Sequence, residues 1–310
     1  MSSPLRIAAF CLALAACAEA APPADDTTDA PTPQATSLLG EPLYAMEDTT
    51  GEIARADEAL AQSPDDVELI IAAGRVRRNY WQYRDAMALY TRAIELAPQD
   101  WRPYRFRGHR HISVREFDQA VTDLERAREL APFNWDVSYH LGLAYYVSGR
   151  FGDAADEYVR CLSMAGDADA ATADAEDFRS CSRNGTDPES LVAMTEWATR
   201  ALLRAGRGAE AEALVAAVPA DLEVSENLSY YHDLLYQKGL KTADELLNLG
   251  PDAPYRLETV GFGVATRLLA QGDTARAMEV FQEIARDPWW PGFGRIAAEA
   301  ELARARQDPA

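Results

Sequence analysis

Residues 135–166 read WDVSYHLGLAYYVSGRFGDAADEYVRCLSMAG, and they form the third copy of a pattern that repeats every 34 residues. Residues of one kind recur with that step along the chain. The columns are Pro64, Pro98, Pro132; Gly74, Gly108, Gly142; Tyr83, Phe117, Phe151; Ala86, Ala120, Ala154; Tyr90, Leu124, Tyr158; and Ala93, Ala127, Cys161. A period of this length is typical of stacked helix pairs, each too small to bury its own apolar face. The columns therefore predict an all-α fold of successive helix–turn–helix units.

Each column has its own physical reason. The glycines and the Ala86 column are small, so we expect them to let the two helices of a unit approach closely. Each proline lacks a backbone N–H and restricts the residue before it, so it ends the second helix of a unit. The aromatic residues of the Tyr83 column are expected to fill the wedge at the turn between the helices.

This pattern resembles the tetratricopeptide repeat. The copy at 135–166 fills the consensus places of that family with Trp135, Leu141, Gly142, Tyr145, Phe151, Ala154 and Tyr158. The resemblance implies a tetratricopeptide-like α-solenoid whose concave groove, lined by the first helix of each unit, binds a protein or peptide segment.

The expected solenoid has about six units. Residues 47–166 hold an N-terminal half unit and three regular units at 67–100, 101–134 and 135–166; an acidic insert at 167–187 breaks the period; and 188–310 holds degenerate units and a terminal helix at 293–306. That helix alternates Ala with Glu and Arg, which predicts a polar capping helix. Trp289, Trp290 and Phe293 are expected to pack under it.

The N-terminus begins with a leader. Residues 1–16 carry Arg6 and then an apolar run that is too short for a permanent bilayer span. The run ends in Leu-Ala-Ala-Cys17, which resembles the bacterial lipoprotein signal; the resemblance implies cleavage before Cys17 and acylation, palmitate included, of that cysteine. The alternative is an ordinary secretory leader cut at a small-residue site. Residues 17–46 are rich in Pro, Ala, Asp and Thr, which predicts a disordered tether.

The expected location follows from this leader. A lipid anchor and tether would hold the domain in the bacterial cell envelope, facing the periplasm. Ala18 rather than Asp follows Cys17. By resemblance to enteric sorting rules, that residue favours the outer membrane.

Two further cysteines remain once the leader is removed and Cys17 is acylated. In an oxidising compartment Cys161 and Cys181 could form a disulfide that closes a 20-residue loop. Such a bond contributes about 3 kcal/mol in the chain-entropy model. The alternative is two unrelated thiols, with Cys161 simply replacing the small alanine of its column.

Composition and motifs argue against several functions. The formal net charge of −20 disfavours nucleic acid and anionic lipid as partners of the whole protein, so the membrane is expected to be contacted only through the anchor. The chain has no His-Glu-x-x-His, phosphate-loop or Gly-x-Ser-x-Gly motif. We therefore expect no enzyme, no catalytic residue, no cofactor and no metal site.

One segment departs from the acidic composition. Residues 75–115 contain ten arginines against three acids. The family resemblance places part of this set in the groove, and the predicted groove residues are Arg75, Arg78, Asn79, Arg102, Arg105, His109, Tyr139, Leu143 and Tyr146. Guanidinium groups bind carboxylates and phosphates in a bidentate manner. The set resembles the carboxylate clamp of chaperone-binding members but has arginines where that clamp has asparagines and lysines.

These observations predict a membrane-tethered interaction scaffold or adaptor that binds an unidentified protein or peptide segment, with an acidic segment as one candidate. An alternative is a binder of a small anionic or glycan ligand in the same basic and aromatic groove. A competing interpretation of the arginines is that they pair with acids on neighbouring units, with Arg77 and Arg107 extending from the seam between helices.

Overall fold

A computed structural model describes residues 31–169, 179–248, 250 and 256–307. The chain divides into the units 1–32 and 33–310, and every helix and strand below belongs to the second. The predicted leader and Cys17 lie outside the described residues. None of the helices in the described ranges is both long and apolar enough to cross a bilayer.

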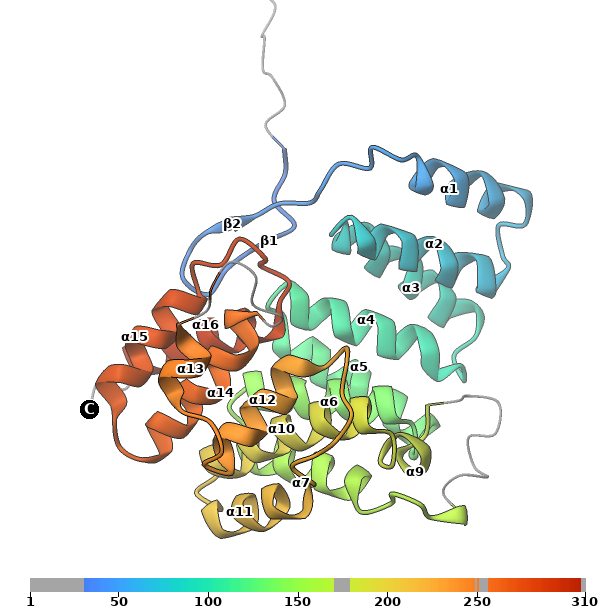
Figure 1. Cartoon of the computed structure of the whole chain (residues 1–310). Coiled ribbons are helices and arrows are strands. Elements are labelled where there is room, and N and C mark those ends of the chain that lie inside the picture. Colours follow the sequence, from blue (N-terminus) through green and yellow to red (C-terminus); the bar gives the residue numbers. More distant parts are fainter. Residues whose placement is uncertain (1–30, 170–178, 249, 251–255, 308–310) are drawn as a thin grey trace, which may run out of the picture. The chain divides into compact units, whose positions relative to one another are not determined.

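The regular repeats lie where the 34-residue period places them. After α1 (Glu52–Gln62), the pairs are α2 (Val67–Asn79) with α3 (Tyr83–Leu96), α4 (Trp101–Ser113) with α5 (Phe117–Leu130), and α6 (Trp135–Val147) with α7 (Phe151–Leu162) (Figure 1). The side chains of Asp66, Asp100 and Asn134 accept hydrogen bonds from backbone N–H groups at the starts of α2, α4 and α6. These caps satisfy donors that have no partner inside the helix.

The glycine column sets the distance between the helices of each unit. A Cβ atom on Gly74, Gly108 or Gly142 would lie 2.5, 2.6 or 2.4 Å from the side chain at 90, 124 or 158, respectively. The large residue of the second helix therefore fits only because the first helix has no side chain there. This confirms the predicted role of the column.

The C-terminal half contains less regular helix pairs. They follow the short α9 (Cys181–Asn184) and are α10 (Pro188–Arg204) with α11 (Gly208–Ala217), α12 (Leu228–Gln237) with α13 (Ala243–Leu247), and α14 (Leu257–Ala270) with α15 (Thr274–Ile284), followed by α16 (Phe293–Gln307). Within the described residues the structure is an all-α, tetratricopeptide-like solenoid, with one two-stranded sheet as its only other regular element.

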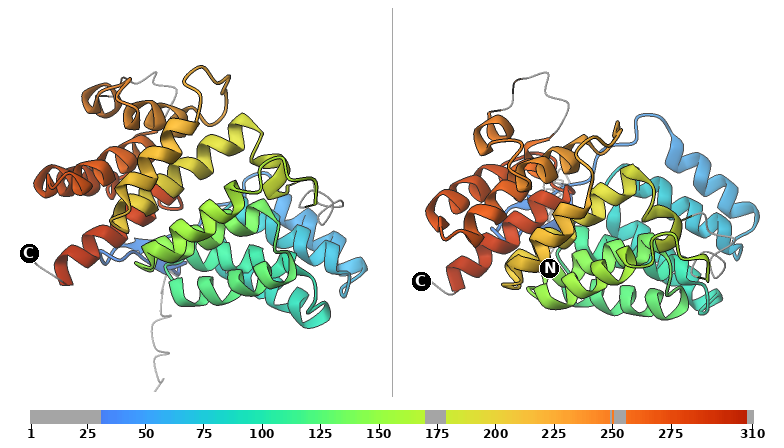
Figure 2. Two further views of the ribbon diagram at one scale, coloured as in Figure 1. Left: turned by 90° about the horizontal axis from the view of Figure 1, so that it is seen from below. Right: turned by 60° about the horizontal axis from the view of Figure 1, so that its bottom comes forward.

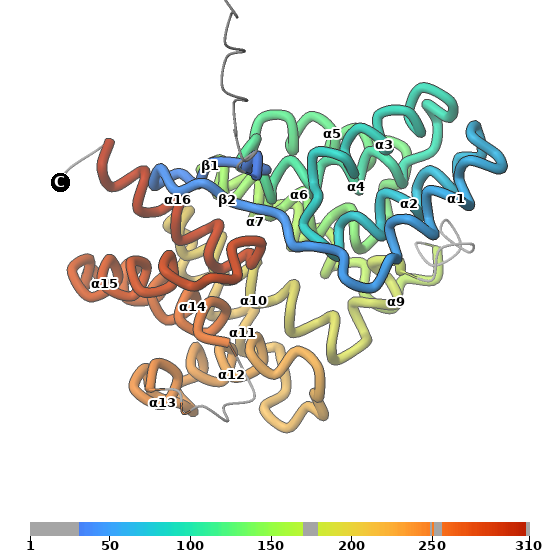
Figure 3. The backbone as a smooth tube through the Cα atoms, turned by 90° about the horizontal axis from the view of Figure 1, so that it is seen from above, coloured from blue at the N-terminus to red at the C-terminus, as the bar shows by residue number. Residues whose placement is uncertain are grey.

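This half packs back onto the regular repeats. Helix α10 lies along α7, and α16 contacts α6 as well as α14 and α15 (Figure 2). Seen from above, α2 and α4 lie on the side of the repeats that faces α10 and α12, whereas α3 and α5 lie on the outer side (Figure 3). One hydrophobic cluster consequently extends from Ile112 in α4 to Leu302 in α16.

The predicted polar cap is wrong in one respect. Most of α16 is buried, including the side chains of Arg295, Glu299 and Glu301. Glu299 and Glu301 form ion pairs with Arg115 and Arg204, at 2.7 and 2.9 Å. The alternation of small and charged residues in α16 is therefore that of a helix packed between the two halves of the fold. It is not that of a solvent-exposed capping helix.

The predicted tether is also wrong at its C-terminal end. Residues 33–46 contain the antiparallel strands β1 (Ala35–Thr36) and β2 (Pro42–Leu43). Ala35 and Leu43 are buried in a cluster with Tyr83 and Trp290, and the indole N–H of Trp290 donates to the backbone carbonyl of Tyr44 at 3.0 Å. The apolar partners of this segment come from distant helices, so no local periodicity reveals its order. Residues 17–30 lie outside the described residues.

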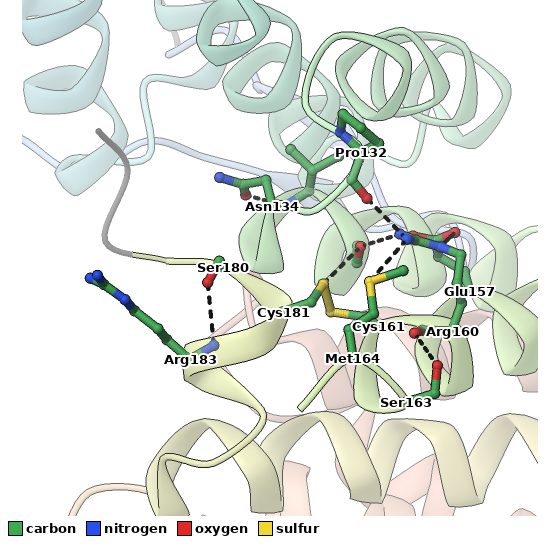
Figure 4. The surroundings of a disulfide bond; sticks show 12 residues. Pro132, Asn134, Glu157, Arg160, Cys161, Ser163, Met164, Ser180, Cys181 and Arg183 are labelled. Carbon is green, nitrogen blue, oxygen red and sulfur yellow. Dashed lines mark hydrogen bonds and ion pairs between the residues drawn. A yellow bond between two sulfur atoms is a disulfide. The ribbon is translucent and has the colours of Figure 1, made fainter. Parts of the chain in front are cut away.

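In the structure Cys161 and Cys181 are joined by a disulfide (Figure 4). The bond links the end of α7 to the start of α9. The backbone of this region is further held by N–H to carbonyl bonds from Trp135 to Arg179 at 2.9 Å and from Cys181 to Phe133 at 2.8 Å. Residues 179–181 are therefore fixed against the start of α6.

Candidate functional site

Most of the arginines between 75 and 115 are neutralised inside the fold. Seven of the ten have a carboxylate partner, and the pairs are Arg77–Asp57, Arg84–Glu116, Arg92–Asp65, Arg102–Glu68 and –Asp100, Arg105–Asp136, Arg107–Asp123, and Arg115–Glu299. For these residues the pairing interpretation describes the structure. Arg77 and Arg107 reach Asp57 and Asp123 at 2.7 Å each from the seams between helices.

Two of the predicted groove arginines belong to this paired set. Arg102 contacts Asp100 at 2.6 Å and Glu68 at 2.5 Å, so its charge is already shared by two acids. Arg105 is 9% exposed and lies 3.4 Å from Asp136. Burial lowers the pKa of Arg105, with Asp136 opposing that effect. Neither residue presents a free guanidinium group to solvent.

Four other predicted groove residues contact the protein's own C-terminal half. Leu143 and Tyr146 are fully buried, and the Tyr146 ring packs edge-on against Trp197 at 5.6 Å. The prediction that these two line an open groove is wrong, because it treated each unit without the helices that follow it.

His109 and Tyr139 lie at the same junction and are partly buried. The Tyr139 hydroxyl lies 3.1 Å from that of Tyr230 in α12. The His109 ring lies 4.2 Å from His140 and 5.1 Å from Phe293 of α16, measured between centroids. Both residues therefore help to join the two halves.

The remaining predicted groove residues form an accessible basic face on α2. Arg75 and Asn79 are exposed and Arg78 is partly exposed. Among the described residues no carboxylate pairs with Arg75 or Arg78. Arg75 lies 5.8 Å from the Phe106 ring centroid, and Arg78 donates to the Asn79 side-chain oxygen at 3.2 Å. This α2 face (Arg75, Arg78 and Asn79) keeps its positive charge available to a partner.

Sequence reasoning missed one functional candidate, Arg110 on α4. Its column partners 34 residues away are Val76 and Ala144, so a charged residue stands in an otherwise apolar column. Arg110 is 4% exposed, and its guanidinium carbon lies 4.5 Å from the Tyr83 ring centroid. It has no carboxylate partner among the described residues. The break in the column was the available signal.

Arg110 lines a pocket of about 250 Å³ between the two halves. One wall consists of Tyr83, His109, Arg110 and Ser113; the other consists of Tyr230, Glu258, Trp289, Pro291, Gly292 and Phe293. Burial lowers the pKa of Arg110 to about 10, which leaves it protonated at neutral pH. Burial, with the charge of Arg110 beside it, lowers the pKa of His109 well below its ordinary value, so His109 is neutral there.

A wider cleft of about 850 Å³ lies between α10, α11, α12 and α14. Its two cationic side chains already have acceptors, because Arg267 donates to the Gln237 carbonyl at 2.6 Å and Lys238 to the Ala216 carbonyl at 3.4 Å. Both cationic side chains of this cleft are therefore engaged by backbone carbonyl groups of the protein itself.

Residues 107–171 match the model of the tetratricopeptide repeat family. The chain is similar to the small glutamine-rich tetratricopeptide repeat-containing protein 2 of Saccharomyces cerevisiae, with 35% identity over 85 residues, which are 27% of this chain and 25% of that protein. It is also similar to the tetratricopeptide repeat-containing protein trd-1 of Caenorhabditis elegans, with 27% identity over 106 residues, 34% of this chain and 13% of that protein. The chain thus spans a quarter or less of these curated relatives.

Two solved structures are also similar to the chain. YrrB, described as a TPR protein with an unusual peptide-binding site, aligns with a TM-score of 0.42 and 15% identity over 80% of this chain and 97% of its own. The Naa15/Naa10 complex bound to HypK-THB aligns with a TM-score of 0.35 and 16% identity over 81% of this chain and 36% of the matched chain.

Proposed function

We propose that this protein is an interaction scaffold or adaptor that binds an acidic protein or peptide segment on the α2 face. The repeats provide a rigid helical support, and proteins with such repeats mediate protein–protein interaction. The observation that carries the proposal is the unpaired charge of Arg75 and Arg78 in a chain that neutralises seven of the ten arginines in the same window.

The chemistry of the α2 face favours a carboxylate-rich partner. Two guanidinium groups three residues apart on a helix lie on one side of it. Each guanidinium group can donate two hydrogen bonds to one carboxylate of a partner, and neither group has to leave an existing ion pair to do so. Because both groups are accessible, their contribution is expected to weaken with salt. Three of the predicted groove residues thus carry the proposed site.

The proposal also includes the location predicted from the leader. The protein would be lipid-anchored at Cys17 in the bacterial envelope, facing the periplasm, with the outer membrane favoured. The motif Leu-Ala-Ala-Cys17 supports this part. Mass spectrometry of the mature N-terminal peptide tests it: an acylated Cys17 is expected, and an unmodified N-terminus downstream of Cys17 would reject the anchor.

Binding is tested with a fluorescent oligoglutamate peptide and the double variant Arg75→Glu/Arg78→Glu. We expect wild type to bind the peptide in low salt, and the double variant to lose at least tenfold in affinity with an unchanged circular dichroism spectrum. The matched control is Arg92→Glu/Arg126→Glu, which reverses two arginines held in exposed ion pairs. Equal loss in both double variants would show a net-charge effect and reject the α2 face.

A further inference from the structure

The pocket around Arg110 is distinct from the α2 face. It lies between helix α4 and the segment 289–293, is partly open to solvent, and has a volume of about 250 Å³. A helix or folded domain does not fit into this space, whereas a small molecule does. Any ligand here would be held by both halves of the fold at once.

The wall formed by α4 has an unusual electrostatic feature. Burying an ion without a partner is costly, and proteins ordinarily supply a counter-charge. The chain does so for Arg115, five residues later, through Glu299. For Arg110 the described part of the chain supplies the face of the Tyr83 ring and no carboxylate. A cation–π contact is worth about 2 kcal/mol when desolvated, which is less than the several kcal/mol that desolvation of an ion costs.

The remaining polar groups of the pocket are largely occupied. The Ser113 hydroxyl donates to the His109 carbonyl at 3.1 Å. The Tyr230 hydroxyl accepts from Trp197 at 3.3 Å and lies 3.1 Å from the Tyr139 hydroxyl. Glu258, on the opposite wall, accepts from the Gly294 N–H at 3.0 Å. Arg110 is therefore the cationic side chain among the residues that line this pocket, and none of these hydrogen bonds provides it with a counter-charge.

The opposite wall limits the charge of the ligand. Glu258 is a carboxyl group, and it faces a site with a single cation. A singly charged anion satisfies Arg110 without placing a second negative charge towards Glu258, whereas a doubly charged phosphate does not. The rings of Trp289, Phe293 and Tyr83 provide an apolar surface beside this cation.

We propose that this pocket binds a small organic monocarboxylate, whose carboxylate pairs with Arg110 and whose apolar body contacts the aromatic walls. The assignment rests on the size of the pocket, the burial of Arg110 and the lack of a carboxylate partner for it within the described chain. It does not depend on peptide binding at the α2 face.

The first test is a titration of the purified mature protein with benzoate, acetate, inorganic phosphate and chloride. Calorimetry measures binding of each anion, and thermal unfolding measures its effect on the melting temperature. Benzoate is expected to bind and to raise the melting temperature, and phosphate and chloride at the same ionic strength are expected not to. Equal effects of all four anions would mean an adventitious ion only, and would reject the proposal. The proposal would also be overturned if neither benzoate nor acetate has an effect at about 10 mM, which is about the highest useful concentration for a weak site.

Two variants separate a binding role from a structural one. Arg110→Met should weaken benzoate binding at least tenfold, while the unliganded variant melts at or above the wild-type temperature because a buried, unpaired charge is gone. The matched control Arg92→Met removes an arginine of α3 that belongs neither to the α2 face nor to the pocket lining, and it should bind within twofold of wild type. Unchanged benzoate affinity in Arg110→Met would reject the site.

A measurement on wild type covers the case in which Arg110→Met fails to fold. Hydrogen exchange of the backbone in residues 289–293 and at the end of α4 should slow when benzoate is added. Exchange in α2 should not change, which distinguishes this pocket from the α2 face. Protection confined to other segments would overturn the assignment.

Discussion

The guanidinium group of Arg115 binds the carboxylate of Glu299 through two hydrogen bonds, of 2.7 and 3.0 Å, although 184 residues separate them in the chain. The two side chains are 2% and 0% exposed. Arg115 also donates to the carbonyl oxygens of Ser113 and Trp290, at 2.5 and 3.1 Å. This buried group of bonds joins the second repeat to the last helix and holds the two halves in register.

Glu299→Gln should destabilise the fold strongly. The change keeps the shape but leaves Arg115 buried without a counter-charge, and breaking a buried pair in this way costs about 3–5 kcal/mol. Urea unfolding followed by circular dichroism measures the loss. The control is Glu129→Gln, which breaks the exposed pair with Arg126 and should cost less than about 1 kcal/mol. Similar losses in both variants would contradict the role of Glu299 in joining the halves.

Gly142→Ala should show that the glycine column fixes the helix spacing. The new methyl group would lie 2.4 Å from the ring of Tyr158, which is fully buried and has no room to move. Overpacking of this kind costs about 1–3 kcal/mol. Gly152→Ala is the matched control, since no atom of the described residues lies within 4 Å of a Cβ there, and it should stabilise α7 by up to about 1 kcal/mol. A stabilised Gly142→Ala variant would be inconsistent with this packing.

The regular repeats could be predicted because their signals are local. Helix starts at 67, 101 and 135 follow from residues within one period, and the small residue at 142 and the large one at 158 are 16 residues apart. The prediction for the terminal helix is wrong because charged residues such as Glu299 and Glu301 indicate an exposed helix when only the local sequence is considered. The arginines with which they pair, Arg115 and Arg204, lie far away in sequence.

The same reason explains the mixed result for the groove. Arg75 and Asn79 are exposed and Arg78 is partly exposed, because no described residue of the C-terminal half covers them. Leu143 and Tyr146 were placed wrongly, because the helices that bury them belong to units without the regular spacing. The sequence distinguishes Arg110 only as a charged residue in an otherwise apolar column. Its pocket could not be predicted, because the opposite wall includes residues from 289–293, which are distant in sequence.

Reduction of the Cys161–Cys181 bond should lower stability. The bond closes a loop of 20 residues, which corresponds to about 3 kcal/mol in the chain-entropy model. We expect urea unfolding to shift to lower concentration in dithiothreitol and in Cys181→Ala, with no further effect of dithiothreitol on that variant. Alkylation of the non-reduced protein provides the direct check, because two alkylated cysteines in its mass spectrum would show that the bond is not formed.

Glu196→Gln should change how stability depends on pH. Arg200 contacts Glu196 at 3.1 Å and Asp233 at 2.8 Å, and all three side chains are fully buried. Burial and the nearby Asp233 raise the pKa of Glu196 well above its ordinary value, and burial also raises that of Asp233. One cation thus faces two carboxyl groups, which favours retention of a proton in the folded state.

The sign follows from proton linkage. Between the unfolded pKa of a glutamate, about 4.3, and the raised folded pKa, the folded state binds more protons than the unfolded state, so stability falls as pH rises. The wild type should therefore lose stability relative to Glu196→Gln above about pH 4.5, by at most about 1.4 kcal/mol per pH unit for one proton. Urea unfolding at several pH values measures the difference, with exposed Glu212→Gln as the control. Parallel curves for wild type and Glu196→Gln would show that no proton is held at this site, because a glutamine cannot release one.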